Sequence, residues 1–281
     1  MIGLALLALV AFAANSVLAR FALGADRIDP ASFTAIRLAS GAIVLWLVLR
    51  WQGAAAPSGP RPGRWTGAAL LFLYAAPFSF AYVSLPTGTG ALVLFGAVQL
   101  TMIGAALRSG ERPLLREWAG LLLALLGLVY LNLPGLGAPA PAGVALMALA
   151  GIAWGLYSLR GRAAGLPLRR TAESFIFAMP MGILLAAFTM RGAHLSGVGI
   201  GCAVASGALA SGGGYAAWYA VLPRLTAARA GTIQLAVPVI AAVAGAAILG
   251  ERITLRLALS AAAILGGVGL AISARMSTRE T

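Results

Sequence analysis

Aromatic side chains recur at helical spacing in the apolar stretches of this chain. Tyr74, Phe78 and Tyr82 follow one another every fourth residue, so they share one face of the helix that this stretch predicts. Tyr215 and Trp218 lie nearly one turn apart in a second apolar stretch. Rings of this kind, with few charges around them, suit a flat ligand that is apolar or zwitterionic. The first chemistry that the sequence indicates is therefore noncovalent binding of a small molecule.

Uncharged polar side chains inside apolar stretches form a second set of candidates, to which Ser211 also belongs. Such groups are costly in hydrocarbon and usually face a cavity or a partner helix. Amides and hydroxyls can bind the ammonium and the carboxylate of an amino acid without adding a permanent charge. Taken together, the candidate substrate-binding residues are Trp154, Phe78, Trp218, Tyr215, Tyr74, Tyr82, Tyr157, Phe95, Asn15, Gln99, Ser158 and Gln234.

Each of these groups also has a structural interpretation. Aromatic residues of membrane helices often pack against neighbours or form an interfacial belt, and Tyr82, near a helix end, fits the belt as well as a cavity. Asn15 and Gln99 fit an interhelical hydrogen bond about as well as they fit a ligand site. For rings nearer the middle of a stretch, such as Trp154 and Trp218, we favour the cavity.

Arg37 is the one charged residue well inside an apolar stretch. We expect it to snorkel outward or to pair with Asp29, and a substrate carboxylate is the third alternative. Two apolar stretches end in Gly-Glu-Arg, and the charged residues there are expected to be structural anchors or gate elements. These are Glu111, Arg112, Glu251 and Arg252. No acidic residue occupies the middle of a stretch, so no proton relay is evident in the sequence.

The composition indicates that the stretches lie in a membrane. The chain has 281 residues, of which 61% are hydrophobic and 10% are charged, whereas a soluble domain carries about 25% charged residues. An apolar run of roughly 17–25 residues can cross the hydrocarbon core as a helix. We expect an all-α membrane protein with ten transmembrane helices, at about residues 2–20, 31–50, 65–84, 88–107, 116–133, 141–159, 172–190, 197–221, 228–248 and 254–273.

The basic residues indicate how the helices are oriented. A formal net charge of +13 would favour nucleic-acid binding in a soluble protein. Here all twenty basic residues are arginines and nearly all lie between apolar runs, which is typical of membrane topology and argues against a nucleic-acid partner. Loops on the side of both termini hold fourteen arginines, against five on the opposite side. Both termini are therefore expected in the cytoplasm.

The sequence matches itself when it is shifted by 140 residues. Arg20 then meets Arg160, and the Gly-Glu-Arg sequence at 110–112 meets the one at 250–252. This divides the chain into two halves, 1–137 and 138–281. Each half holds five expected spans, an odd number, so the second half must enter the membrane from the opposite side. Such inverted repeats are the usual architecture of alternating-access carriers, with a site between the halves.

Two corresponding segments carry a resemblance to a known family. The stretch from Ala81 to Arg112 and its counterpart from Val221 to Arg252 each contain a helix of small residues and then an apolar helix ending in Gly-Glu-Arg. This pattern resembles the drug/metabolite transporter superfamily and, within it, the EamA-type ten-helix carriers. Trp154 and the Tyr-Ala-Ala-Trp sequence at 215–218 resemble the YddG-like aromatic amino-acid exporters. The resemblance implies export of aromatic amino acids and similar zwitterions.

Other classes lack the residues that they need. A Walker-type ATP-driven pump requires a glycine-lysine pair, and the chain has no lysine. An enzyme requires a catalytic set, whereas His194 is the single histidine and Cys202 the single cysteine. The same scarcity leads us to expect no metal and no other cofactor. A channel or scramblase would more often expose rings of like charge.

We therefore expect a secondary transporter in the bacterial cell inner membrane that exports small metabolites by alternating access, amino acids including aromatic ones being the first choice. A broad drug/metabolite exporter and an exporter of small polar amino acids are the alternatives. A nucleotide-sugar carrier is disfavoured, because its phosphates call for cations inside the membrane and only Arg37 qualifies. The expected partners are the substrate and the lipid bilayer, and the arrangement is compatible with a monomer.

Overall fold

The computed structural model describes residues 2–53, 63–108, 115–133, 138–162, 167–221, 233–234 and 236–277. Within these ranges the chain is helical, and an isolated antiparallel bridge between Ile28 and Leu195 is the one strand-like pairing. The helices before residue 138 are α1 Ile2–Leu23, α2 Pro30–Trp51, α3 Arg64–Tyr82, α4 Thr87–Arg108 and α5 Leu115–Asn132. Those after it are α6 Pro141–Arg162, α7 Pro167–Phe188, the 3-10 turn η1 Met190–Gly192, α8 Gly197–Ala205, the π-helix η2 Ser206–Gly213, α9 Gly214–Val221, α11 Ala236–Leu249 and α12 Leu255–Ser277.

Local sequence sets the helix ends that matter for the site. Asp29 caps α2, because its Oδ1 accepts hydrogen bonds from the backbone N–H groups of Ala31 at 3.1 Å and Ser32 at 2.8 Å. Pro30 follows at the first helical position, where its missing N–H is not needed. At the end of α11, Gly250 has a φ of +68°, a conformation that a Cβ would disfavour, and the chain turns there toward α12.

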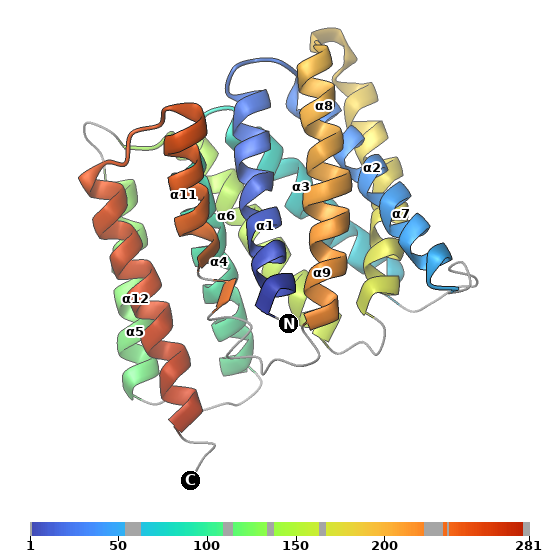
Figure 1. The fold of residues 1–281 in the computed structure, drawn as a ribbon. Coiled ribbons are helices and arrows are strands. Elements are labelled where there is room, and N and C mark those ends of the chain that lie inside the picture. The colour runs from blue at the N-terminus through green and yellow to red at the C-terminus, as the bar shows by residue number, and fades with distance from the viewer. Residues whose placement is uncertain are drawn as a thin grey trace.

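The helices lie side by side and run up and down the molecule, and the start of α1 and the end of α12 lie at the same end (Figure 1). At one edge α5 packs on α12, and at the other α2 packs on α7. Between these edges α6 contacts α3 and α4, while α1 contacts α11 and the continuous helix made of α8, η2 and α9. The middle of the bundle is therefore the place where helices from both ends of the chain meet.

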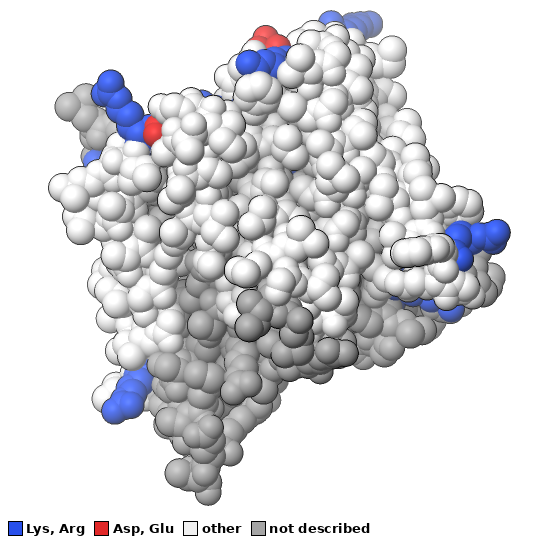
Figure 2. Space-filling model, viewed as in Figure 1, with Lys and Arg blue, Asp and Glu red and all other residues white. Residues whose placement is uncertain are grey.

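The outside of the bundle is apolar between its two ends. Figure 2 shows the charged residues at the ends of the helices and an uncharged band between them. Large aliphatic side chains point outward in this band, including Leu126 at 55% exposed, Leu184 at 57% and Val243 at 56%. In water such a surface would be unfavourable, so its solvent is the lipid bilayer.

Six helices in the described ranges are long and apolar enough to cross a membrane. They are the helical segments at Gly3–Leu23, Pro30–Trp51, Arg64–Tyr82, Pro141–Arg160, Leu168–Phe188 and Gly197–Trp218. Shorter apolar helical segments lie at Thr87–Met102, Trp118–Leu131, Ala236–Leu249 and Leu255–Gly267. The architecture is thus a membrane-embedded helical bundle, as the sequence predicts, while the count of ten spans stays a prediction.

The segment expected as one uninterrupted helix at 197–221 changes its winding at η2, where eight residues are π-helical. Glycines permit a close approach here: a Cβ on Gly207 would collide with Ser40 Oγ and with the Arg37 carbonyl oxygen of α2. A Cβ on Gly214 would lie 2.8 Å from the Cβ of Ala11 in α1. The glycines therefore serve close packing, and the π-helix brings Ser206 and Ser211 toward the centre.

Candidate functional site

The centre of the bundle holds a fully buried cation. Arg37 lies two turns into α2, and its side chain is only 1% exposed. Its Nη2 donates a hydrogen bond to the Tyr74 hydroxyl of α3 at 2.9 Å, and its Nε donates to Ser211 Oγ of η2 at 3.3 Å. Its Nη1 has no hydrogen-bond partner in the part of the chain that the structure describes. No carboxylate of the described residues lies within ion-pair distance of this guanidinium.

Two aromatic faces flank the same guanidinium. The guanidinium carbon lies 4.7 Å from the ring centroid of Phe78 and 5.1 Å from that of Tyr74. The electron-rich face of an aromatic ring attracts a cation without neutralising it. Arg37 is therefore stabilised by rings and neutral hydroxyls, and its full positive charge is retained at the centre of the molecule.

A chain of hydrogen bonds continues from Arg37 to α1. The Ser211 hydroxyl, which accepts from Arg37, lies 3.4 Å from Asn15 Oδ1 and can donate to it. Ser206, one turn earlier in η2, donates to the same oxygen at 2.7 Å. All of these groups are nearly inaccessible to solvent. This polar chain links α1, η2, α2 and α3, helices far apart in the sequence.

Aromatic rings fill the space beside the polar chain. Trp154 of α6 lies at their middle, with ring centroids 4.9 Å from Tyr74, 5.2 Å from Tyr215 and 5.5 Å from Tyr157. The planes of Trp154 and Tyr215 are only 19° apart, so these rings are stacked. We call the whole set the ring cluster; it consists of Phe12, Tyr74, Phe78, Tyr82, Trp154, Tyr157, Phe175, Tyr215 and Trp218.

Above the ring cluster, at the end opposite the termini, an ion pair ties three segments together. Arg20 Nε lies 3.4 Å from Glu251 Oε1. The two carboxylate oxygens of Glu251 accept the backbone N–H of Thr87, at 3.0 and 2.9 Å. Arg20 Nη1 also donates to the carbonyl oxygens of Tyr82 and Val83, at 3.2 and 3.0 Å. The end of α1, the turn between α3 and α4, and the turn after α11 thus meet in one closed contact.

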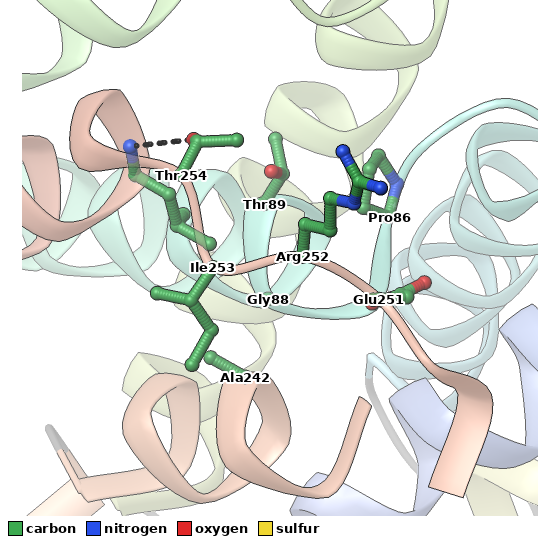
Figure 3. Close-up of a pocket in the computed structure, with 9 residues that line it drawn as sticks. Pro86, Gly88, Thr89, Ala242, Glu251, Arg252, Ile253 and Thr254 are labelled. Carbon is green, nitrogen blue, oxygen red and sulfur yellow. Dashed lines mark hydrogen bonds between the residues drawn. The ribbon is translucent and has the colours of Figure 1, made fainter. Parts of the chain in front are cut away.

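A small pocket lies next to this contact, between the start of α4 and the turn after α11 (Figure 3). Glu251 and Arg252 line it, and Figure 3 shows the Arg252 side chain extended toward Pro86. Its volume is about 70 Å³. Small-molecule sites usually enclose about 300–1,000 Å³, so this pocket can hold a few water molecules but not a metabolite.

Comparison with known proteins identifies the family of this chain. The sequence pattern of the EamA-like transporter family matches the chain twice, at residues 1–133 and at residues 141–273. The chain belongs to the EamA-like transporter family. With its apolar helices, family membership makes the chain an integral multi-pass membrane protein, and the family is one of transporters rather than of enzymes.

Relatives of this EamA-like chain extend over most of its length. An uncharacterized protein of Pseudomonas aeruginosa is 50% identical over 273 residues, which are 97% of this chain and 94% of that protein. An uncharacterized transporter of Archaeoglobus fulgidus is 26% identical over 198 residues, which are 69% of this chain and 70% of that protein. A protein known from a crystal structure has the same fold, with a TM-score of 0.70 at 22% identity, over 96% of this chain and 98% of that one.

The EamA-like structure gathers most of the aromatic residues singled out from the sequence. The ring cluster contains Tyr74, Phe78 and Tyr82 of α3. It also contains Tyr215 and Trp218 of α9. Trp154 and Tyr157 of α6 belong to it as well. Phe95 is buried on α4, but it has no ring contact in the part of the chain described.

Two of the polar candidates, Asn15 and Ser211, belong to the polar chain, and the other three take no part in its hydrogen bonds among the described residues. Asn15 is part of the polar chain and makes the interhelical hydrogen bonds that its alternative interpretation required. Ser158 donates to the Trp154 carbonyl of its own helix at 2.8 Å. Gln99 is buried on α4 with its Nε2 lacking a hydrogen bond, and Gln234 is half-buried in a short helical fragment.

The expected behaviour of Arg37 is wrong in two respects. Arg37 does not snorkel, because its whole side chain is buried at the bundle centre. It does not pair with Asp29 either, because the Asp29 carboxylate caps α2 two turns away, with Oδ1 bound to backbone N–H groups. Of the expected anchor residues, Glu251 forms the closed contact and Arg252 lines the pocket. Glu111 and Arg112 lie outside the described residues.

Sequence reasoning missed two rings and one backbone group. Phe12 joins Tyr215 at 5.7 Å and Trp218 at 6.0 Å, and Phe175 joins Tyr215 at 5.9 Å. The only available signal was their position inside apolar runs, which does not distinguish them from lipid-facing aromatics. The N–H of Thr87 could not be identified from side-chain chemistry at all, because it is the orphan donor at the start of α4.

Proposed function

We propose that this chain is a secondary transporter that exports small metabolites across the bacterial inner membrane by alternating access, with amino acids, including aromatic ones, as the first class to test. One observation carries the proposal: the ring cluster and the polar chain lie at the bundle centre and are built from α1, α2 and α3 together with α6, α7, η2 and α9. A site shared by the two parts of the chain can be opened to either side of the membrane by moving one part against the other.

The proposed architecture is ten spans arranged as two inverted five-helix repeats, residues 1–137 and 138–281. Two findings support it. The family pattern occurs twice, and the two matches begin 140 residues apart. Helices at equivalent places in the two parts also pack on each other, α2 on α7 and α5 on α12, as a two-fold arrangement requires.

The contacts that cross the centre come in related pairs as well. α3 packs on α6, and the helix made of α8, η2 and α9 packs on α1; each pairing joins the third helix of one part to the first helix of the other. α4 packs on α6 as α11 packs on α1. In this arrangement residues 1–137 and residues 138–281 contact each other through related surfaces. Two conformations of similar free energy, one open to each side of the membrane, are therefore expected.

The conformation seen here is closed at the end opposite the termini. Arg20, Glu251 and the backbone of Thr87 hold the described segments of that end together, and the pocket beside them is too small for a metabolite. If both termini are cytoplasmic, as the arginine distribution predicts, the closed end is the outer one. Substrate would then reach the centre from the cytoplasm and replace ring–ring contacts of the ring cluster with its own.

Counterflow in liposomes containing the purified protein tests this function. Labelled phenylalanine, tryptophan, threonine and a sugar nucleotide would be compared, with and without an imposed proton gradient. Saturable flux of phenylalanine or tryptophan supports an aromatic amino-acid exporter, and flux of threonine alone supports the small polar alternative. Absence of saturable flux for every solute, in protein shown to be folded and correctly inserted, would refute the assignment of these substrates.

A further inference from the structure

The buried guanidinium of Arg37 is charged but has no counter-ion among the described residues. An arginine stays protonated over the whole accessible pH range. Burying an ion is costly unless it is paired and hydrogen-bonded, so buried arginines normally face a carboxylate. Here the hydrogen-bond acceptors are the neutral hydroxyls of Tyr74 and Ser211.

A purely structural link between α2, α3 and η2 would not require this charge. A neutral amide could donate to both hydroxyls without the cost of burying an ion. The ring faces of Phe78 and Tyr74 reduce that cost but leave the charge intact. Nη1 has no acceptor among the described residues, and the side chain is only 1% exposed to solvent. The retained charge and the unused donors are what an anion receptor needs.

The fixed orientation of Arg37 adds to this argument. Nε and Nη2 are held by Ser211 at 3.3 Å and Tyr74 at 2.9 Å, and Ser211 is in turn linked to Asn15. The guanidinium plane is therefore oriented before any ligand arrives. Carboxylates bind such a fork through parallel N–H···O bonds, which are short and strong because both partners are charged.

We propose that Arg37 is the receptor for a carboxylate group of the transported molecule, whose flat apolar part lies against the ring cluster. The inference rests on the proposed transport function and names its substrate class as aromatic carboxylic acids. The described carboxylates form no ion pair with this guanidinium, so among the described residues the site offers a charged partner for an anion and none for an ammonium. Organic anions should therefore bind better than zwitterionic amino acids, and amines should bind worst.

A series of ligands with one ring and different charges tests the proposal in the wild-type chain. 3-Phenylpropionate, phenylalanine and 2-phenylethylamine are anionic, zwitterionic and cationic versions of nearly the same skeleton. Their affinities for the purified full-length protein would be measured by calorimetry in chloride-free buffer, and again with chloride as a competitor. The expected affinity is highest for 3-phenylpropionate, lower for phenylalanine and lowest for 2-phenylethylamine. Tighter binding of the amine than of the carboxylates would overturn the proposal.

Variants then assign the effect to one guanidinium. Arg37→Gln keeps hydrogen-bond donors for Tyr74 and Ser211 but removes the charge, and 3-phenylpropionate should bind at least about tenfold more weakly. Arg37→Lys restores the charge without the fork and should recover part of this loss. The matched control is Arg50→Gln, which changes an exposed arginine near the end of the same helix and should leave affinity unchanged. Unchanged affinity in folded Arg37→Gln protein would refute the proposal.

The two proposals can fail separately. If the liposomes transport phenylethylamine or a sugar nucleotide but neither carboxylate, the chain is a transporter and the role given to Arg37 is wrong. If 3-phenylpropionate binds in an Arg37-dependent way but no solute crosses the membrane, the receptor is present and the transport function is wrong. Should Arg37→Gln fail to fold, the wild-type ligand series still decides between the anion and the alternatives.

Discussion

Arg37 and Ser211 are joined by a hydrogen bond of 3.3 Å between Nε and Oγ, and both side chains are fully buried. This contact connects α2 with the π-helix η2. Because Ser211 can pass the interaction on to Asn15, a single hydroxyl joins the charged residue to α1. The Ser211 hydroxyl is therefore expected to stabilise the contacts of η2 with α1 and α2 at the bundle centre.

Ser211→Ala should destabilise the protein, because it leaves Arg37 Nε without an acceptor in a buried site. The expected loss is about 1–3 kcal/mol of unfolding free energy, measured by thermal unfolding in detergent or lipid nanodiscs. Thr189→Ala is the control, since its exposed hydroxyl donates only to the carbonyl oxygens of Leu185 and Ala186 at the nearby end of α7. Equal melting temperatures for the two variants would show that the central hydrogen bond contributes nothing to stability.

Trp154→Ala and Trp218→Ala should each reduce counterflow at least about tenfold, because a ring that stacks on substrate contributes strongly to binding. Trp154→Phe should keep part of the activity, since it retains a flat apolar face. Trp118→Ala is the control, because this tryptophan of α5 is half exposed and outside the ring cluster. Protein amounts in the membrane must be compared. Normal transport in both alanine variants would remove the ring cluster from the substrate path.

Glu251→Gln should loosen the closed end, because it removes the ion pair with Arg20 and weakens the acceptor for the Thr87 N–H. A partly exposed pair of this kind at a helix start is worth roughly 1 kcal/mol, so the open population should rise about fivefold. Thiol labelling by a membrane-impermeant reagent at Thr89→Cys, in a Cys202→Ser background, measures the opening. Labelling that is no faster than in the same background with Glu251 intact would show that this contact does not hold the end closed.

Gly207→Ala and Gly201→Ala should have opposite effects, although both glycines lie on the helix from α8 to α9. A Cβ at Gly207 would collide with the backbone of Arg37, and the expected cost is about 1–3 kcal/mol. A Cβ at Gly201 would meet nothing, so alanine there should stabilise the helix by about 0.5–1 kcal/mol. Thermal unfolding of the pair measures the difference; a stable Gly207→Ala protein would contradict the close approach of η2 to α2.

The helices and the ring cluster could be anticipated because both depend on local patterns. Apolar length predicts each span, and the four-residue spacing of Tyr74, Phe78 and Tyr82 fixes a common face. The sequence also marked Glu251 as an anchor. Its partner Arg20 lies at the other end of the chain, and no local rule pairs two residues so distant.

The surroundings of Arg37 show where sequence reasoning fails. Snorkelling is the expected behaviour of an arginine on an isolated membrane helix, but this side chain is bound between α3 and η2 inside the bundle. The π-helix that brings Ser211 to it has no recognisable local signal, because its glycines also fit an ordinary α-helix. Only the packed structure reveals that the charge has two aromatic faces and no acid within reach among the described residues.

A permanent charge within a membrane-spanning helix also makes the protein responsive to the membrane potential. Moving one elementary charge through a difference of 100 mV changes its energy by about 2.3 kcal/mol. If α2 shifts along the membrane normal when the empty carrier reorients, the bare guanidinium of Arg37 moves in that field, whereas a guanidinium bound to a carboxylate is electrically neutral. Voltage should then affect the return of the empty carrier and leave the loaded step almost unchanged, so an imposed potential would alter net efflux far more than exchange.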